Sequence, residues 1–183
     1  PVDPQTSLTP LDGPLLSDAT LYHQLVGRLV YLTVTRPDIA YAVHIVSQLM
    51  TPPRSPHYAA LVRILRYLKG TLFHGLLYSP HSSLQLHAFS DADWTGDPTD
   101  RRSTTGCWFF LGTSLISWRS KNHTLVARSS TEAEYRALVD TTQELVWLRW
   151  LLSVMGVAHS AATNLYSDNQ SAIQISHNDV FHD

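Results

Sequence analysis

Three short stretches of the sequence each carry a carboxylate at the edge of an apolar element. They are residues 89–94 (FSDADW), 130–135 (STEAEY) and 165–170 (LYSDNQ). Asp91 and Asp168 each follow a strand-like run, and Glu134 lies near the start of a long predicted helix. An Asp, a helical Glu and a second Asp suit a site that hydrolyses phosphodiesters with two metal ions. Taken singly, each residue is more typical of a turn or a cap, so the set of three carries the prediction.

Residue spacing predicts that Glu134 faces the core. Steps of four and three residues from Glu134 reach an apolar stripe: Leu138, Thr141, Leu145, Leu148 and Leu152. Glu132 instead lies on a polar face, three residues after Ser129, where it suits a capping box. We therefore expect Glu134 to be the metal ligand and Glu132 the cap. The alternative exchanges them, with Thr131 capping through Glu134.

The two Asp residues meet Glu134 if their strands are adjacent and parallel. Both carboxylates would then emerge at the same edge of the sheet, where ligands bind in such folds. Three negative charges repel, and a divalent cation is the usual remedy. All-oxygen ligands favour Mg²⁺ or Mn²⁺ over zinc, and we expect two ions. Asp93 and Asp97 are nearby spare ligands, although a turn role is more typical of them.

Composition indicates a soluble intracellular protein, cytoplasmic or nuclear, without membrane contact. The 183 residues are 44% hydrophobic and 15% charged, with a net charge of −2, so any basic surface is local. No signal peptide or membrane-length apolar run is present. The single cysteine, Cys107, lies in an apolar run and is expected to be buried. The ten histidines show no zinc spacing. His177 and His182 lie near the end of the sequence, where they could approach the carboxylates, although a surface role is more typical of them.

Basic and aromatic residues are interleaved between the first and second carboxylates. The candidates for nucleic-acid binding through phosphate contacts are Arg101, Arg102, Arg119, Lys121 and Arg128. The alternative is that these are solvated loop residues. Trp94, Trp108 and Trp118 lie among them and could stack on nucleic-acid bases, although they are expected mainly in the core.

The elements that must position these residues fall into two parts. A proline-rich leader, residues 1–16, precedes three predicted helices over about 17–32, 37–50 and 55–70. These helices are short, so we expect a small bundle docked on the rest of the chain. The sequence then predicts strands over 84–90, 106–111, 115–118 and 163–167, and helices over 130–155 and 170–176. This order predicts an α/β mixed sheet with packed helices, preceded by a helical extension. We place the domains at 1–80 and 81–183.

These stretches resemble the ribonuclease H region of Ty1/copia-type retrotransposon polyproteins, particularly plant ones. The matching residues are 89–96 (FSDADWTG), 101–106 (RRSTTG), 129–137 (SSTEAEYRA) and 166–172 (YSDNQSA). Upstream, residues 22–27, 35–40 and 65–70 resemble the segment between polymerase and ribonuclease H. The resemblance implies a ribonuclease H-like fold with catalytic, metal-binding Asp91, Glu134 and Asp168. It also implies an RNA–DNA hybrid as substrate and other polyprotein parts as partners.

Two departures from the family bear on activity. No Tyr-x-Asp-Asp motif is present, so DNA synthesis is not expected. The sequence ends before the family's last strand and the helix that carries a fourth carboxylate. Asp179 and Asp183 are the substitutes near the end. We therefore expect a ribonuclease H-type endonuclease that binds metal but cuts weakly, better with Mn²⁺ than with Mg²⁺.

Two other functions compete with this one. The first is a retroelement fragment, truncated or adopted by a host, that binds nucleic acid or protein without cutting. The second is a transposase- or integrase-like nuclease, which the position of a helical Glu between the two Asp residues disfavours.

Overall fold

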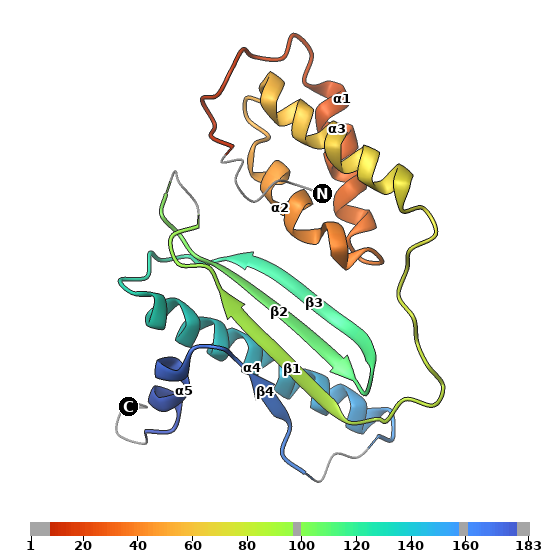
Figure 1. Cartoon of the computed structure of the whole chain (residues 1–183), viewed down its shortest axis with the longest axis vertical. Coiled ribbons are helices and arrows are strands. Elements are labelled where there is room, and N and C mark those ends of the chain that lie inside the picture. The colour runs from red at the N-terminus through yellow and green to blue at the C-terminus, as the bar shows by residue number, and fades with distance from the viewer. Residues whose placement is uncertain (1–7, 97–99, 158–160, 179–183) are drawn as a thin grey trace. The chain divides into compact units, whose positions relative to one another are not determined.

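The computed structural model describes residues 8–96, 100–157 and 161–178. The chain divides into two compact units, Pro1–Leu76 and Leu77–Asp183 (Figure 1). Four residues considered above, Asp97, Asp179, His182 and Asp183, lie outside the described part.

The first unit is helical, as its apolar spacing predicts. Its elements are α1 (Thr20–Leu32), the 3₁₀ turn η1 (Pro37–Ile39), α2 (Ala40–Gln48) and α3 (Ser55–Gly70). Their apolar stripes form one core of Tyr22, Val26, Leu29, Ile39, Ala42, Val43, Val46, Leu61 and Ile64. The second helix differs from the prediction, because residues from Pro37 first form a tighter turn in which the Ala40 N–H bonds to the Pro37 carbonyl.

The described part of the leader is attached to the start of α3. Arg54 Nε donates to the Pro10 carbonyl at 2.9 Å, and His57 Nε2 lies 2.9 Å from the Thr9 carbonyl. Leu15 pairs with Arg54 in an isolated antiparallel bridge. These contacts satisfy backbone groups that a leader without partners would leave to water.

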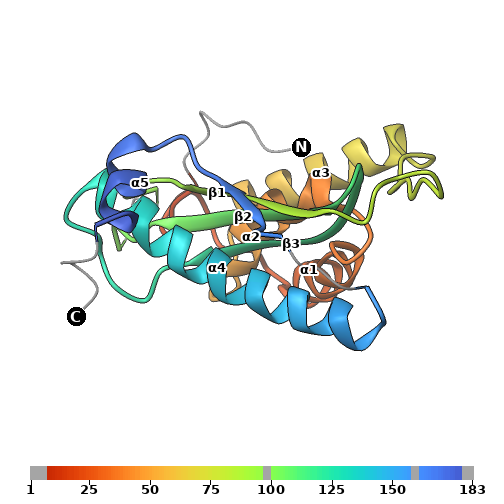
Figure 2. The ribbon, with the colours of Figure 1, turned by 90° about the horizontal axis from the view of Figure 1, so that it is seen from below.

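The described residues of the second unit form a four-stranded mixed sheet with two helices. Its elements are β1 (Leu86–Ala92), β2 (Thr104–Leu111), β3 (Ser114–Asn122), α4 (Ser130–Val154), β4 (Asn164–Tyr166) and α5 (Gln170–Ser176). The strand order is β3-β2-β1-β4. β1 and β3 are antiparallel to β2, and β4 is parallel to β1. Figures 1 and 2 show α4 lying along one face of this sheet. The predicted mixed α/β architecture is confirmed.

The core of the second unit lies between the sheet and α4. It consists of Leu86, Ala88, Cys107, Phe109, Leu145, Leu148 and Leu152. The stripe predicted along α4, from Glu134 to Leu152, is buried at every position. Cys107 is buried as expected.

The strand ends differ from those that the sequence predicts: β2 and β3 are longer, β4 is shorter, and β1 is shifted by two residues toward its carboxyl end. β1 continues through Asp91 to Ala92 because these residues pair with Gly106 and Thr105 of β2. β3 likewise continues to Asn122, which pairs with Thr104. Cross-strand hydrogen bonds, rather than side-chain alternation, set these ends.

The expectation that the tryptophans lie mainly in the core is wrong for two of them. Trp94 is 49% exposed and Trp108 is 41% exposed. Trp94 follows β1 and donates from Nε1 to the Ala127 carbonyl at 3.1 Å. Trp108 lies between Cys107 and Phe109, which both face α4, so it points to the opposite side of the sheet.

Within the described segments, none of the helices has the length and apolar character needed to cross a membrane.

Candidate metal centre

Parallel pairing of β1 with β4 brings the two Asp residues to one edge of the sheet. Phe89 of β1 pairs with Tyr166 of β4. Asp91 lies two residues beyond this pair on β1, and Asp168 lies two residues beyond it in the bend that follows β4, so both occur at the same edge of the sheet. The predicted adjacency of the two strands is confirmed.

The cap of α4 sets which glutamate faces the sheet. Ser129 accepts a hydrogen bond from the Glu132 N–H at 3.1 Å. The Glu132 carboxylate accepts from the Arg128 N–H at 2.8 Å and pairs with Arg136 at 2.9 Å. Glu132 is therefore an outward capping residue, and Glu134, two positions later, is only 5% exposed. The alternative in which Glu134 caps and Glu132 faces inward is wrong.

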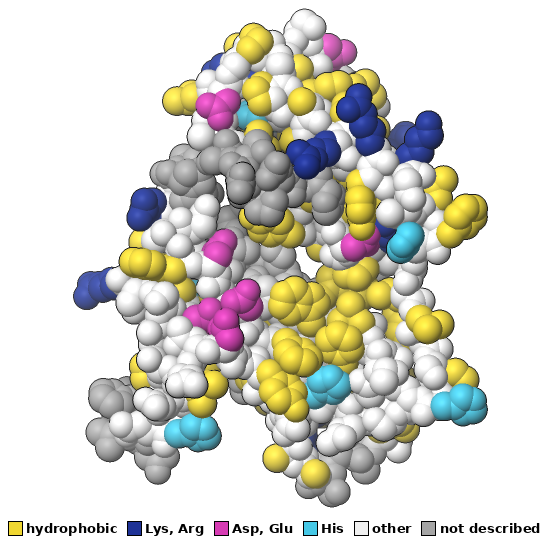
Figure 3. All heavy atoms as spheres, viewed as in Figure 1, with side chains coloured by type: hydrophobic (Ala, Val, Ile, Leu, Met, Phe, Trp, Pro, Cys, Tyr) yellow, Lys and Arg dark blue, Asp and Glu magenta, His cyan; other side chains and the backbone are white. Residues whose placement is uncertain are grey.

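The three carboxylates converge. Asp91, Glu134 and Asp168 each present an oxygen, and these oxygens all lie within 4.8 Å of one another. Asp91 and Asp168 are exposed, whereas Glu134 forms the buried side of the cluster. Figure 3 shows acidic side chains gathered on one face beside a patch of hydrophobic side chains.

An open hollow of about 350 Å³ adjoins the carboxylates. Its walls include Phe89, Trp108 and Tyr166 beside Asp91 and Asp168. Sequence reasoning missed this aromatic wall. Strand alternation carried the signal, because Phe89 and Asp91 are two residues apart and share a face.

Glu134 has one satisfied and one unsatisfied oxygen. Its Oε1 accepts a hydrogen bond from the Ala92 N–H at 3.1 Å, while its buried Oε2 has no partner among the described residues. The pKa of Glu134 is raised to about 7, mainly by burial and in addition by the charges of Asp91 and Asp168, while the hydrogen bond from the Ala92 N–H acts in the opposite direction. A buried carboxylate oxygen without a donor fits a cation, and the all-oxygen set fits Mg²⁺ or Mn²⁺.

The five basic candidates are exposed but spread over several elements. Arg101 and Arg102 precede β2, Arg119 and Lys121 lie on β3, and Arg128 precedes α4. β3 is the edge strand farthest from β4, so the structure does not bring Arg119 and Lys121 to the carboxylates. Arg102 pairs with Asp100 at 3.2 Å. Nucleic-acid binding by these five residues stays a prediction.

Neither Asp93 nor His177 belongs to the group of candidate metal ligands among the described residues. Asp93 accepts a hydrogen bond from the Thr104 N–H and closes the loop after β1, as its predicted turn role requires. His177 is exposed at the end of α5, as expected.

Comparison with known proteins finds a retroelement family. The chain is 46% identical over 182 residues to the Retrovirus-related Pol polyprotein from transposon RE1 of Arabidopsis thaliana. The aligned residues make up all of this chain and 12% of that polyprotein. It is 42% identical over 162 residues to the corresponding polyprotein from transposon TNT 1-94 of Nicotiana tabacum, covering 88% of the chain and 12% of the relative. The chain belongs to the Ty1/copia-type Pol polyproteins.

The chain therefore spans about an eighth of the length of these polyproteins. Shorter relatives also match. Secreted RxLR effector protein 161 of Plasmopara viticola is 49% identical over 128 residues, 69% of this chain and 90% of that protein. No protein-family model and no solved structure matches the chain.

Proposed function

We propose that the second unit is a ribonuclease H-type endonuclease that cuts the RNA strand of RNA–DNA hybrids with divalent metal. The observation that carries the proposal is the convergence of Asp91, Glu134 and Asp168 within 4.8 Å. The sequence motifs around these residues and the membership in retrotransposon Pol polyproteins support it.

Each carboxylate has a distinct task in this proposal. Asp91 and Asp168 project from the edge of the sheet and would hold metal on its open side. Glu134 would bind through Oε2, since Oε1 is held by the Ala92 N–H. When bound, two divalent ions would activate the attacking water and stabilise the leaving oxygen of the cleaved bond. The rigid strand and helix keep the ligands in place before substrate arrives.

The substrate would be recognised by shape and backbone rather than by sequence. RNA–DNA hybrids present phosphates and 2′-hydroxyls in a wide groove, and proteins contact these groups without reading bases. Arg101, Arg102, Arg119, Lys121 and Arg128 are the phosphate-binding candidates, of which Arg101, Arg102 and Arg128 lie in loops. Each single substitution of one of these residues should weaken binding to the same extent for hybrids of different base sequence.

A side-by-side cleavage assay tests the proposal. The 183-residue chain is incubated with an RNA–DNA hybrid, double-stranded RNA and duplex DNA, each with Mg²⁺, Mn²⁺ or EDTA. We expect cleavage of the RNA strand of the hybrid alone, abolished by EDTA and by Asp91→Asn. Cleavage that survives Asp91→Asn or EDTA would refute the assignment.

A second function is binding without cleavage. The short RxLR relative and the Uncharacterized mitochondrial protein AtMg00240 of Arabidopsis thaliana, of which this chain covers 86%, consist largely of the shared region. This region thus occurs outside long polyproteins. If hybrid binds with equal affinity to the original chain and to Asp91→Asn and neither cuts, this second function is favoured.

A further inference from the structure

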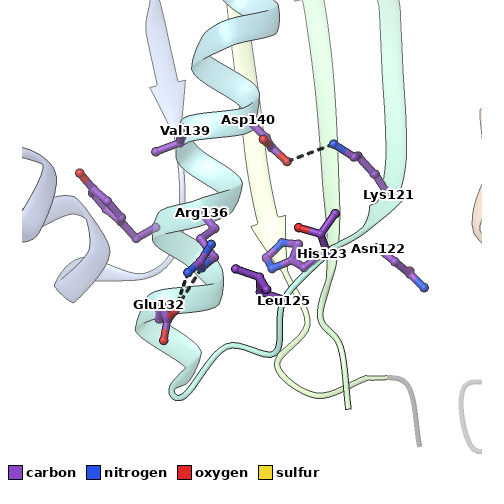
Figure 4. A pocket seen from close by; sticks show the side chains of 10 residues that line it. Lys121, Asn122, His123, Leu125, Glu132, Arg136, Val139 and Asp140 are labelled. Carbon is purple, nitrogen blue, oxygen red and sulfur yellow. Dashed lines mark hydrogen bonds and ion pairs between the residues drawn. The ribbon is translucent and has the colours of Figure 1, made fainter. Parts of the chain in front are cut away.

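A second hollow of about 400 Å³ lies between the end of β3, the segment after it and the first turns of α4 (Figure 4). It is lined on the helix side by Glu132, Arg136 and Asp140. These residues occupy a different face of α4 from Glu134, so the hollow is separate from the carboxylate cluster.

His123 is the buried polar residue of this hollow. It is 8% exposed, and its Nε2 lies 2.7 Å from the Thr105 hydroxyl. Its Nδ1 is buried without a hydrogen-bond partner among the described residues. Burial lowers the pKa of His123, against the nearby charge of Asp140, so the ring is neutral at pH 7. Such an unpaired ring nitrogen is costly, and a ligand that bonds to Nδ1 removes that cost.

Apolar walls and a charged rim surround this nitrogen. Leu125 and Val139 line the hollow and are 58% and 43% exposed. Figure 4 shows Lys121 directed toward Asp140 and Arg136 toward Glu132 at the rim. The Lys121–Asp140 distance is 4.0 Å, at the limit of an ion pair. Arg136 donates to Glu132 Oε1 through Nε and Nη2, at 3.1 and 2.9 Å.

We infer that this hollow binds one unpaired nucleotide. The flat base lies between Leu125 and Val139 and hydrogen-bonds to His123, and its phosphate contacts Lys121 and Arg136. A pocket with apolar walls, a single buried polar group and a charged rim suits a heterocycle that carries an anionic group. A neutral imidazole that is already bonded through Nε2 offers Nδ1 as donor or acceptor, so either base class can bind.

Binding is measured on the full chain by NMR of the His123 ring nitrogens and by calorimetry. The probes are uridine and adenosine 5′-monophosphate, ribose 5-phosphate, inorganic phosphate and a short single-stranded oligonucleotide. We expect a mononucleotide or the oligonucleotide to shift the Nδ1 resonance. Ribose 5-phosphate and inorganic phosphate, which carry no base, should leave this resonance unchanged. The mononucleotide and oligonucleotide arms distinguish a free nucleotide from an unpaired one in a strand.

Replacing His123 would leave Thr105 unpaired in the core, so the test variant is Leu125→Asp at the exposed wall. It should weaken binding at least tenfold. The matched control is Val126→Asp, since Val126 is the neighbouring residue, is 50% exposed and lies outside the pocket lining. The control should bind like the original chain.

Three outcomes overturn the inference. They are no Nδ1 shift with any nucleotide, an equal shift with inorganic phosphate alone, and equal loss in both Asp variants. Asp91→Asn should leave nucleotide binding unchanged. Loss of hybrid cleavage in that variant with intact nucleotide binding would therefore keep the two proposals apart.

Discussion

The Ala92 N–H donates to Glu134 Oε1 at 3.1 Å and thereby joins β1 directly to α4. This hydrogen bond orients the carboxylate so that its second oxygen is buried near Asp91 and Asp168. Burying the charged form of the Glu134 carboxylate costs free energy, and its unpaired oxygen can bind a cation. Both the stability of the fold and metal binding should therefore depend on whether Glu134 is protonated.

Stability of the second unit should fall as the pH rises from 5 to 7 without metal. The folded chain keeps a proton on Glu134 up to a pKa of about 7, whereas the ordinary value is 4.5. The stabilisation is therefore complete below pH 4.5 and is lost as the pH rises through 7, by at most about 3 kcal/mol. Urea unfolding followed by tryptophan fluorescence measures it, because all five tryptophans lie in this unit.

The control for this pH dependence is Glu134→Gln, which cannot ionise. Its unfolding free energy should stay nearly constant between pH 5 and 7. Saturating Mg²⁺ should also flatten the profile of the original chain, since the cation offsets the buried charge. An identical pH slope in the original chain and in Glu134→Gln would contradict the assignment to this residue.

Metal binding should require Glu134 and not Glu132. Glu134→Gln removes an inward ligand and should weaken Mn²⁺ binding by at least about tenfold. Glu132→Gln alters a residue of the same type two positions away, where the carboxylate caps the helix and pairs with Arg136. Calorimetric titration with Mn²⁺ at pH 8 compares them, and equal losses would indicate that the cluster acts only through its overall negative charge.

Removing the cap of α4 should destabilise the second unit without altering its core. Ser129→Ala deletes the acceptor for the Glu132 N–H and should cost about 1 kcal/mol. The neighbouring exposed Ser130 provides the control, and Ser130→Ala should change stability by less than about 0.5 kcal/mol. Urea unfolding at pH 5 compares them. Equal effects of the two substitutions would show that the side chain of Ser129 contributes nothing as a cap.

In the first unit, Asp38→Asn should weaken the connection between η1 and the end of α3. Asp38 pairs with the largely buried Arg36 at 2.6 Å and accepts from the Tyr67 hydroxyl at 2.9 Å. Loss of the charged partner should cost about 1–3 kcal/mol. Amide hydrogen exchange in α1, α2 and α3 measures it in the full chain.

The same pair predicts acid sensitivity of the first unit. The hydrogen bond from Arg36 holds the pKa of Asp38 below its ordinary 3.8. The stabilisation is therefore present above that value and is lost as the pH falls through the lower, folded-state pKa.

Asp18→Asn is the control for Asp38→Asn, because Asp18 is exposed and Asn keeps an oxygen acceptor for the Thr20 N–H. Faster exchange in the Asp18 variant than in the Asp38 variant would contradict this role.

The sequence alone determined the elements with strong local signals. Helical periodicity located α3 and the inward stripe of α4, and the spacing of Ser129 from Glu132 separated the cap from the buried carboxylate. Turn and cap chemistry is local, so these features follow from neighbouring residues. The same information identified Asp91, Glu134 and Asp168 as a set, from their positions at element edges.

Only the tertiary structure decided how these residues meet. Parallel pairing of β4 with β1 brings Asp168 beside Asp91, and the extension of β1 through Ala92 supplies the N–H that holds Glu134. Strand ends and burial depend on partners far along the chain, which is why Trp108 lies on an exposed sheet face and His123 is buried with an unpaired nitrogen. Local sequence patterns do not include contacts between residues far apart in the chain. The exposure of Trp108 and the burial of His123 could therefore be known only from the tertiary structure.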